Sequence, residues 1–136
     1  MTNNEIIDSA EKTIKPKIVD DRLIGNVGAT LITDTGNSYS GVCIDTGSGT
    51  GFCAEASAIA AMVTAGEYKI KKIVAVWKDD NGELYVLPPC GRCRLFIHQM
   101  DKNNIDTEVV MGKSKSLRLS ELLPYTDWPR PLKDEA

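Results

Sequence analysis

The chain has no excess of basic residues, no long apolar run and only one histidine. It has 136 residues, with 16 Lys and Arg against 19 Asp and Glu, and a formal net charge of -3. A protein that mainly holds phosphate backbones normally carries a basic excess, so we expect no nucleic-acid partner. No apolar stretch approaches the length of a membrane span, so we expect no membrane partner either.

The N-terminus also lacks the features of a secretory signal. Met1 to Glu5 provide neither a basic flank nor an apolar core, which predicts a cytoplasmic protein. The chain has 4 cysteines, and in a cytoplasmic chain of this size a C-x-x-C pair is more often a metal or redox element than a disulfide. We therefore expect all four cysteines to be reduced.

Length and hydrophobic periodicity predict one α/β domain spanning residues 1–136, in which a tail from about residue 125 is loosely ordered. The apolar patterns predict helices at 4–15, 53–66, 90–100 and 119–123. They predict strands at 27–33, 38–44, 70–77, 84–87 and 107–111, of which 70–77 reads as an interior strand. This order of elements indicates a sheet sandwiched between helices.

Two short motifs carry the chemistry. Cys53-Ala54-Glu55 opens one predicted helix, and Pro89-Cys90-Gly91-Arg92-Cys93 opens another. Together they supply three sulfur ligands and one free carboxylate. Zinc held by three protein ligands keeps a position open for water, whose pKa it lowers to about 7, while an unliganded carboxylate can move protons. The set predicts a catalytic Zn²⁺ site with Cys53, Cys90 and Cys93 as ligands and Glu55 as the catalytic residue.

Three other interpretations of the cysteines remain open. The C-x-x-C pair alone is also typical of a redox dithiol or of half a structural zinc site. A structural site with four sulfurs would need Cys43, which we place on a strand apart from the motif helices. His98 is five residues beyond Cys93 on the same predicted helix and is not expected to be a ligand.

The glycine-rich stretch 47–51 has the spacing of neither a P-loop nor a dinucleotide-binding loop. It reads as a flexible loop, or as backbone that approaches a substrate beside Cys53. Arg92 and Arg94 flank the cysteines. One of the two arginines could offset the negative charge of three thiolates without binding the metal, and Arg92 is the candidate.

At these motifs the chain resembles the cytidine deaminase family, and within it the blasticidin S deaminases. The resemblance rests on Val27-Gly28-Ala29-Thr30-Leu31, on Cys53-Ala54-Glu55, on Pro89-Cys90-Gly91-Arg92-Cys93-Arg94 and on Glu121-Leu122-Leu123-Pro124. It implies a three-layer α/β/α sandwich with a five-stranded mixed sheet. It also implies a homotetramer whose active sites are completed by neighbouring subunits.

The resemblance further implies that a zinc-activated water attacks C4 of a cytosine ring while Glu55 moves the protons and ammonia leaves. The backbone at Ala54 would meet the pyrimidine carbonyl. The family reads ribose with an Asn-x-Glu pair, and the nearest match here is Cys43-Ile44-Asp45, so Cys43 and Asp45 are the implied substrate-binding residues. Arg92 would replace the family's arginine after the catalytic glutamate, a position held here by Ala56.

The leading hypothesis is therefore a zinc-dependent hydrolytic deaminase acting on a cytosine nucleoside, or on a cytosine-containing nucleoside antibiotic such as blasticidin S. The alternatives are a deaminase of another amino-heterocycle, a non-catalytic zinc module of the same fold and a redox dithiol protein. Glu55 separates the first from the structural module, because a purely structural zinc site has no use for an unliganded carboxylate.

Overall fold

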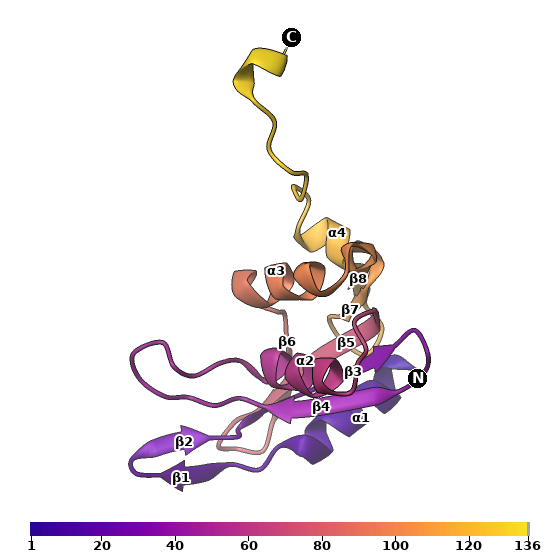
Figure 1. The fold of residues 1–136 in the computed structure, drawn as a ribbon. Helices are drawn as coiled ribbons and strands as arrows, with labels where there is room; N and C mark the ends of the chain where they lie inside the picture. Colours follow the sequence, from indigo (N-terminus) through magenta and orange to yellow (C-terminus); the bar gives the residue numbers. More distant parts are fainter. Residues whose placement is uncertain (136) are drawn as a thin grey trace.

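The computed structural model describes residues 1–135 as a mixed β-sheet with helices on both faces (Figure 1). The strands β3 (Val27–Thr33), β4 (Ser38–Val42), β5 (Ile70–Lys78), β7 (Glu108–Val110) and β8 (Ser116–Arg118) follow the order β4-β3-β5-β7-β8. A further strand, β6 (Leu84–Leu87), pairs with β5. The predicted α/β/α sandwich is confirmed, with six strands in the sheet where five were expected.

Strand β5 lies at the centre of this sheet, as predicted. One of its edges pairs antiparallel with β3 from Ile70 to Trp77. On its other edge, Lys72 and Ile73 pair parallel with β7, whereas Ala75 to Lys78 pair antiparallel with β6. β7 and β6 therefore lie one after the other along the same edge of β5. The chain that leaves β6 leads directly into α3.

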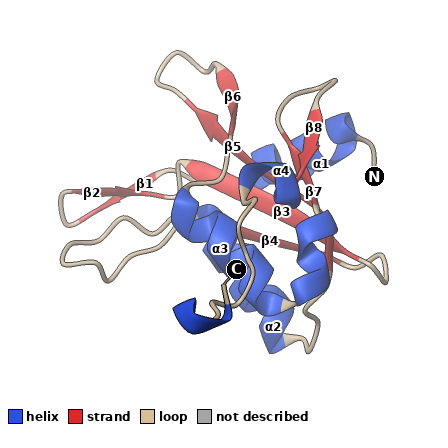
Figure 2. Ribbon diagram, turned by 90° about the horizontal axis from the view of Figure 1, so that it is seen from above, coloured by secondary structure: helices blue, strands red, loops and turns tan. Residues whose placement is uncertain are grey.

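Helices cover the two faces unequally (Figure 2). One face carries α1 (Asn3–Thr13). A capping box between Thr2 and Glu5 stabilises the N-terminus of this helix. The other face carries α2 (Ala54–Thr64), α3 (Gly91–Met100) and the short α4 (Leu119–Leu122). The 3₁₀ turn η1 (Lys102–Asp106) links α3 to β7. Each predicted helix is found within about two residues of its expected ends, which is the usual uncertainty of helix boundaries.

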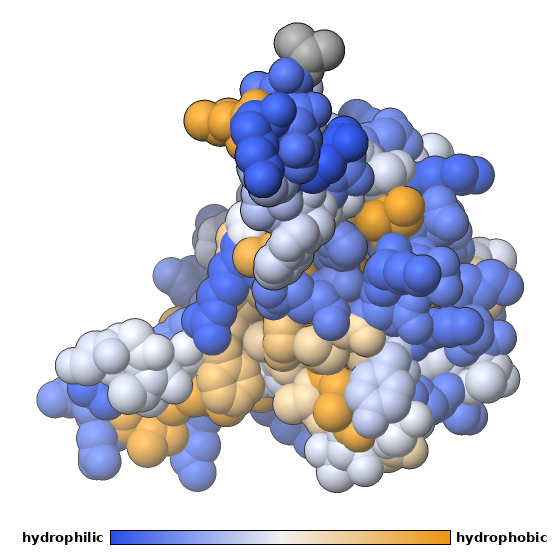
Figure 3. Space-filling model, turned by 45° about the horizontal axis from the view of Figure 1, so that its top comes forward, coloured by the Kyte–Doolittle hydropathy of each residue, from blue (hydrophilic) through white to orange (hydrophobic). Residues whose placement is uncertain are grey.

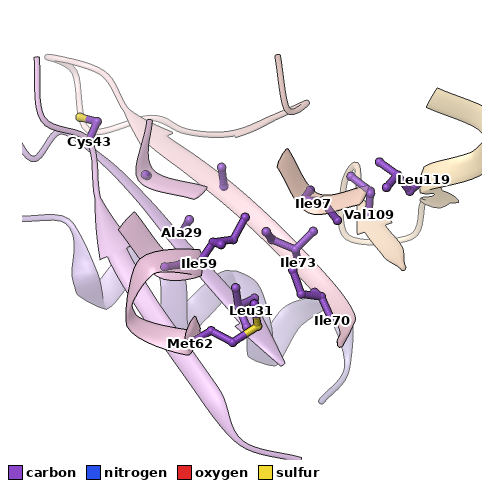
Figure 4. Close-up of a cluster of buried hydrophobic side chains, with 13 residues drawn as sticks. Ala29, Leu31, Cys43, Ile59, Met62, Ile70, Ile73, Ile97, Val109 and Leu119 are labelled. Carbon is purple, nitrogen blue, oxygen red and sulfur yellow. The ribbon is translucent and has the colours of Figure 1, made fainter. Parts of the chain in front are cut away.

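Side chains alternate between the two cores along the central strands. In β3 and β5, Ala29, Leu31 and Ile73 pack beneath α2 (Figure 4). Their neighbours Ile32 and Val74 pack against α1 on the opposite face. Because both faces of these strands are covered, they read in the sequence as continuous apolar runs rather than as alternating ones.

Two glycines allow the helices to approach the sheet closely. A Cβ atom on Gly28 of β3 would lie 2.4 Å from the backbone oxygen of Ala10 in α1. A Cβ atom on Gly41 of β4 would lie 2.4 Å from Cβ of Ser57 in α2. Both distances are far below van der Waals contact, so a side chain at either position would displace a helix, and the start of α2 carries the candidate site.

The buried Asn104 ties α3 to the start of β5. Its side-chain oxygen accepts a hydrogen bond from the backbone N–H of Ile70, and its amide group donates to the backbone oxygens of Tyr68 and Ile97. All three polar contacts are made inside the protein, where an unsatisfied amide would be costly. This clamp fixes α3 relative to the sheet.

A hairpin that the sequence did not reveal projects from the sheet. Strands β1 (Lys17–Val19) and β2 (Arg22–Ile24) are joined by Asp20 and Asp21, whose φ angles are 46° and 70°. Two successive positive φ values are typical of a type I′ turn, which fits the twist of a two-residue hairpin. Strands of three residues are too short to show an alternating pattern, so the periodicity gave no signal.

The C-terminal residues 125–135, including the 3₁₀ turn η2 (Leu132–Asp134), extend away from the sheet (Figure 1). Trp128 is 89% exposed, so it does not dock on the described part of its own chain. Within residues 1–135, no helix combines the length and the apolar character needed to cross a membrane.

Glu67, which follows α2, holds the turn between β3 and β4. Its carboxylate accepts hydrogen bonds from Thr35, from Asn37 Nδ2 at 2.9 Å and from Tyr39 Oη at 2.6 Å. The hydrogen bond from Thr35 and those from Tyr39 and Asn37 lower the pKa of Glu67 to about 2. The Glu67 carboxyl is therefore more easily ionised in the folded protein than in the unfolded chain.

We expect Glu67→Gln to lower the urea midpoint of unfolding at pH 7. A carboxylate with a lowered pKa contributes stability above its unfolded pKa of 4.5, and this contribution is lost as the pH falls towards about 2. The difference between variant and parent should therefore narrow across that interval. Glu83→Gln, at an exposed glutamate in the β5–β6 turn, is the matched control. A difference that stays constant with pH would show that the charge of Glu67 contributes nothing.

Candidate active site

The two helices that carry the motifs both begin at a cysteine. Cys53 is the N-cap residue of α2 and Cys90 is the N-cap residue of α3, each with extended φ and ψ. The Cys53 side chain forms no capping hydrogen bond. The free backbone N–H groups of each first turn, together with the positive end of the helix dipole, favour a thiolate at these positions.

The fold brings Cys53, Cys90 and Cys93 into one cluster. Their sulfur atoms all lie within 4.8 Å of one another, and the sulfurs of Cys53 and Cys90 are 4.0 Å apart. Tetrahedral zinc with Zn–S bonds of about 2.3 Å places two sulfurs about 3.8 Å apart. The cluster is therefore compatible with Zn²⁺ in both its donor atoms and its spacing.

The three thiols differ in their surroundings. Burial raises the pKa of Cys53 and, more strongly, that of Cys93, which is 1% exposed. Burial also raises the pKa of Cys90, but hydrogen bonds from the backbone of Cys93 and from Cys53 outweigh it, so the net direction is downward. Three thiols this close disfavour each other's ionisation, and a bound dication removes that penalty.

Glu55 lies beside the cluster without belonging to it. It is in the first turn of α2, and only 6% of it is exposed. No other side chain within residues 1–135 forms a hydrogen bond or an ion pair with its carboxyl group. Burial raises the pKa of this carboxyl group. A raised pKa makes the carboxyl a better proton acceptor while it can still return the proton, which is what general acid–base catalysis needs.

A cavity of about 690 Å³ opens in front of the cysteines. Its lining includes Cys53, Ala54, Glu55, Cys90 and Arg92, which all come from the two motifs. The volume falls in the range typical of small-molecule sites. The residues that the motifs predicted are thus gathered around one space large enough for a nucleoside-sized ligand.

The opposite walls of the cavity come from segments whose contribution the sequence did not reveal. Phe52 and Trp77 supply aromatic surface, and Trp77 is stacked on Tyr85 with ring centroids 5.2 Å apart. Asn26 supplies a carboxamide next to the first residue of β3. None of the sequence motifs described above includes Asn26.

Cys43 is placed on the cavity wall and not in the sulfur cluster. It follows β4, which ends at Val42 rather than at residue 44 as predicted. Its thiol donates to Asn26 Oδ1 at 3.2 Å and to Asp45 Oδ2 at 3.6 Å. In the part of the chain that the structure describes, the cluster of potential metal ligands contains neither Cys43 nor His98. A four-sulfur site therefore finds no support in this geometry.

The glycine-rich stretch forms the rim of the cavity. Ile44 and Phe52 form an antiparallel bridge that closes the base of the loop. Within the loop, the hydroxyl groups of Thr46 and Thr50 are hydrogen-bonded at 2.8 Å. The loop is thus built by its own contacts, and apolar side chains gather on the projecting hairpin nearby (Figure 3), where Ile18 and Leu23 are exposed.

The two arginines beside the cysteines have different positions. Arg94 donates from Nε to the backbone oxygen of Pro89 and from a terminal nitrogen to that of Leu122. It therefore ties the start of α3 to α4. Arg92 is exposed and lines the cavity together with Cys53 and Cys90.

Comparison with known proteins agrees with this geometry. Residues 4–111 match the model of the cytidine and deoxycytidylate deaminase zinc-binding region. The chain is 34% identical to the blasticidin-S deaminase of Bacillus cereus over 104 residues, which are 73% of this chain and 74% of that protein.

Solved structures share the fold over most of the chain. The cytidine deaminase of Burkholderia pseudomallei superposes with a TM-score of 0.73 at 26% identity, covering 91% of this chain and 98% of that one. The cytidine deaminase of Mycobacterium tuberculosis superposes with a TM-score of 0.66 at 25% identity, covering 91% and 92%.

Proposed function

This chain belongs to the cytidine and deoxycytidylate deaminase family, and from this premise we propose the substrate and the role of each residue. It is a zinc-dependent hydrolytic deaminase that acts on the C–N bond of a cytosine ring. We propose that its substrate is a cytosine nucleoside or a nucleoside antibiotic of the blasticidin S type. The observation that carries this proposal is the buried carboxyl of Glu55, which has no side-chain partner within residues 1–135, in a cavity that Cys53 and Cys90 of the sulfur cluster also line.

Each side chain has a distinct task. The zinc ion would be held by Cys53, Cys90 and Cys93. When bound, it acts as the Lewis acid that activates a water molecule at neutral pH. Glu55 would accept one proton from the attacking water and pass it to ring N3, and would then accept the second proton from the hydroxyl newly formed at C4 and give it to the departing amine. In balance, cytosine and water become uracil and ammonia. Arg92 would offset the negative charge of the thiolates.

The start of α2 also positions the ring. Ala54 is the first residue of that helix, so its backbone N–H has no acceptor within the helix. We propose that it donates to the carbonyl oxygen of the pyrimidine. Phe52, Trp77, Cys43 and Asp45 line the same cavity. The two aromatic side chains would provide apolar area for the flat ring, and Asp45 and Cys43 would face the sugar-like part.

A structural zinc module is disfavoured by the same residues. A closed structural site takes four protein ligands, whereas the described cluster offers three. Burying the carboxyl of Glu55 without a side-chain partner costs stability, and such a cost is typical of a functional site rather than of a purely structural one.

We propose a cytoplasmic homotetramer as the working assembly. Two apolar surfaces support association: the hairpin, where Ile18 is 73% exposed, and the tail, where Tyr125 is 95% exposed. Exposed apolar surface that several neighbouring residues share commonly marks a contact surface between proteins. Light scattering after size-exclusion chromatography should then give about four times the 14.8 kDa of one chain, and a monomer would contradict the proposal.

The experiment that tests the activity is turnover by the zinc-loaded protein on cytidine, deoxycytidine, cytosine and blasticidin S, followed by ultraviolet absorbance and ammonia release. We expect at least one of the nucleoside-type compounds to be converted to its uracil form. A protein that contains zinc but turns over none of the four would contradict the proposed substrate class.

A further inference from the structure

Three polar side chains from separate segments meet on the cavity wall away from the motif helices. Asn26 directly precedes β3, Cys43 directly follows β4, and Asp45 lies in the loop between β4 and α2. All three side chains line the cavity. The thiol of Cys43 is the common point, since it lies 3.2 Å from Asn26 Oδ1 and 3.6 Å from Asp45 Oδ2. The side chains of Asn26 and Asp45 are thus held next to each other.

The hydrogen bonds of this group leave complementary atoms free. Cys43 is 5% exposed, and its single S–H proton is shared between the two oxygens. Because Oδ1 of Asn26 faces the sulfur, Nδ2 of the same amide faces away from it. No hydrogen bond joins that Nδ2 to another group within residues 1–135. The carboxylate of Asp45 likewise accepts no side-chain hydrogen bond there except that of the thiol.

A free donor beside a free acceptor matches one chemical group in particular. A hydroxyl both donates and accepts, so it can accept from Nδ2 of Asn26 while it donates to the carboxylate of Asp45. A site built to bind a hydroxyl in this way rejects the analogue that lacks it, because its own polar groups are then left unpaired.

We propose that Asn26 is a specificity-determining residue that reads, together with Asp45, one hydroxyl of the sugar-like part of the substrate. Cys43 acts in addition as a positioning residue, because its thiol is hydrogen-bonded to both side chains and orients them. The inference rests on the proposed deaminase function and narrows it to substrates that carry a hydroxylated appendage on the cytosine ring. A free base would lack the group that this wall recognises.

Ligand binding tests the assignment independently of turnover. Calorimetric titration of the zinc-loaded protein with uridine, dideoxyuridine and uracil compares ligands with and without sugar hydroxyls. We expect Asn26→Ala to weaken uridine binding about three- to tenfold, as for the loss of a neutral hydrogen bond, and Asp45→Ala to weaken it about ten- to a hundredfold. Binding of uracil should change by less than twofold in both variants.

Kinetic measurements should show the same split. For Asn26→Ala, kcat/KM on cytidine should fall by the factor seen in binding, while kcat/KM on cytosine stays near that of the parent. Asn103→Ala, at an exposed asparagine of η1, is the matched control. Asn26→Asp keeps an acceptor for the thiol but removes the donor and adds a charge beside Asp45, so it should lose more of the nucleoside activity than Asn26→Ala.

Cys43 and the double variant test the coupling. Cys43→Ser keeps a hydrogen donor and should retain more selectivity for uridine over uracil than Cys43→Ala. The losses in Asn26→Ala and Asp45→Ala should not add in the double variant, because both side chains bind the same hydroxyl.

The possible failures can be told apart. Absence of turnover in the parent on every compound would refute the proposed function. An active parent in which Asn26→Ala, or its isosteric variant Asn26→Asp, weakens uridine and uracil equally would refute this inference and leave the deaminase intact. An active parent that prefers cytosine to cytidine would refute it as well.

Discussion

Replacement of Glu55 by glutamine is expected to lower turnover by about 10²–10⁴-fold or more, the usual contribution of a general acid–base group. Glutamine has nearly the same shape as the carboxylic acid, but it cannot take up a proton and release it again. Since Glu55 is outside the sulfur cluster, zinc should stay bound. The variant should also keep its fold, because an amide costs less to bury than a charge.

Three measurements on the Glu55→Gln protein separate mechanism from structure. The rate at saturating substrate reports the proton transfers, elemental analysis reports the zinc content, and the melting temperature reports the fold. Glu121→Gln, at an exposed position in α4, is the matched control and should remain active. Activity of Glu55→Gln within a few-fold of the parent would show that another group moves the protons.

The layout of the fold explains why these residues lie close together. Cys53 and Glu55 enter from α2, while Cys90 and Cys93 enter from α3, and both helices lie on the same face of the sheet. Gly41 lets α2 approach β4 closely, and Asn104 fixes α3 against β5. The helix starts are therefore held by packing and hydrogen bonds that are made elsewhere, which is what a precise site requires.

The long elements could be predicted from the sequence because their patterns are strong. The run 70–77 is apolar and β-branched, and it forms the central strand β5, which ends at Lys78. The helix at 53–66 was placed by its alanine-rich pattern and by Gly66, and α2 indeed ends just before that glycine, whose φ is 87°. In these segments local preference and burial favour the same structure.

The short elements could not be predicted in the same way. Strands β1, β2 and β8 have three residues each and are defined by their partners rather than by their own composition. β8, for example, pairs with β7 through Glu108, Val109 and Val110, a relation that no local pattern contains. Tertiary context decides such segments.

The candidate site divides along the same line. The cysteines and Glu55 could be predicted as site residues because each motif places its reactive side chains within a few residues of one another. Asn26 is seventeen residues from Cys43 along the chain, and only the pairing of β3 with β4 brings them together. No local motif links two residues that meet only through the pairing of their strands.

Loss of any one of the three clustered cysteines is expected to abolish activity and to lower the zinc content. Cys53→Ala, Cys90→Ala and Cys93→Ala would each leave two sulfur ligands, which form a poor site for zinc. Because a bound metal stabilises the folded state, the melting temperature of these variants should also fall and should respond little to added zinc. In the parent protein, treatment with a chelator should reproduce both effects.

Cys43→Ser is the matched control for the metal site, since Cys43 contacts Asn26 and Asp45 and lies outside the sulfur cluster. It should retain about one zinc ion per chain, and its melting temperature should still rise when zinc is added. Elemental analysis of protein purified without added zinc checks both statements. If Cys43→Ser folds but loses the metal, a fourth sulfur belongs to the site and the assignment of three ligands with an open position for water is wrong. If instead the parent protein carries no zinc and two of its clustered thiols oxidise to a disulfide, the cluster is a redox site. The zinc-dependent deaminase mechanism would then be wrong.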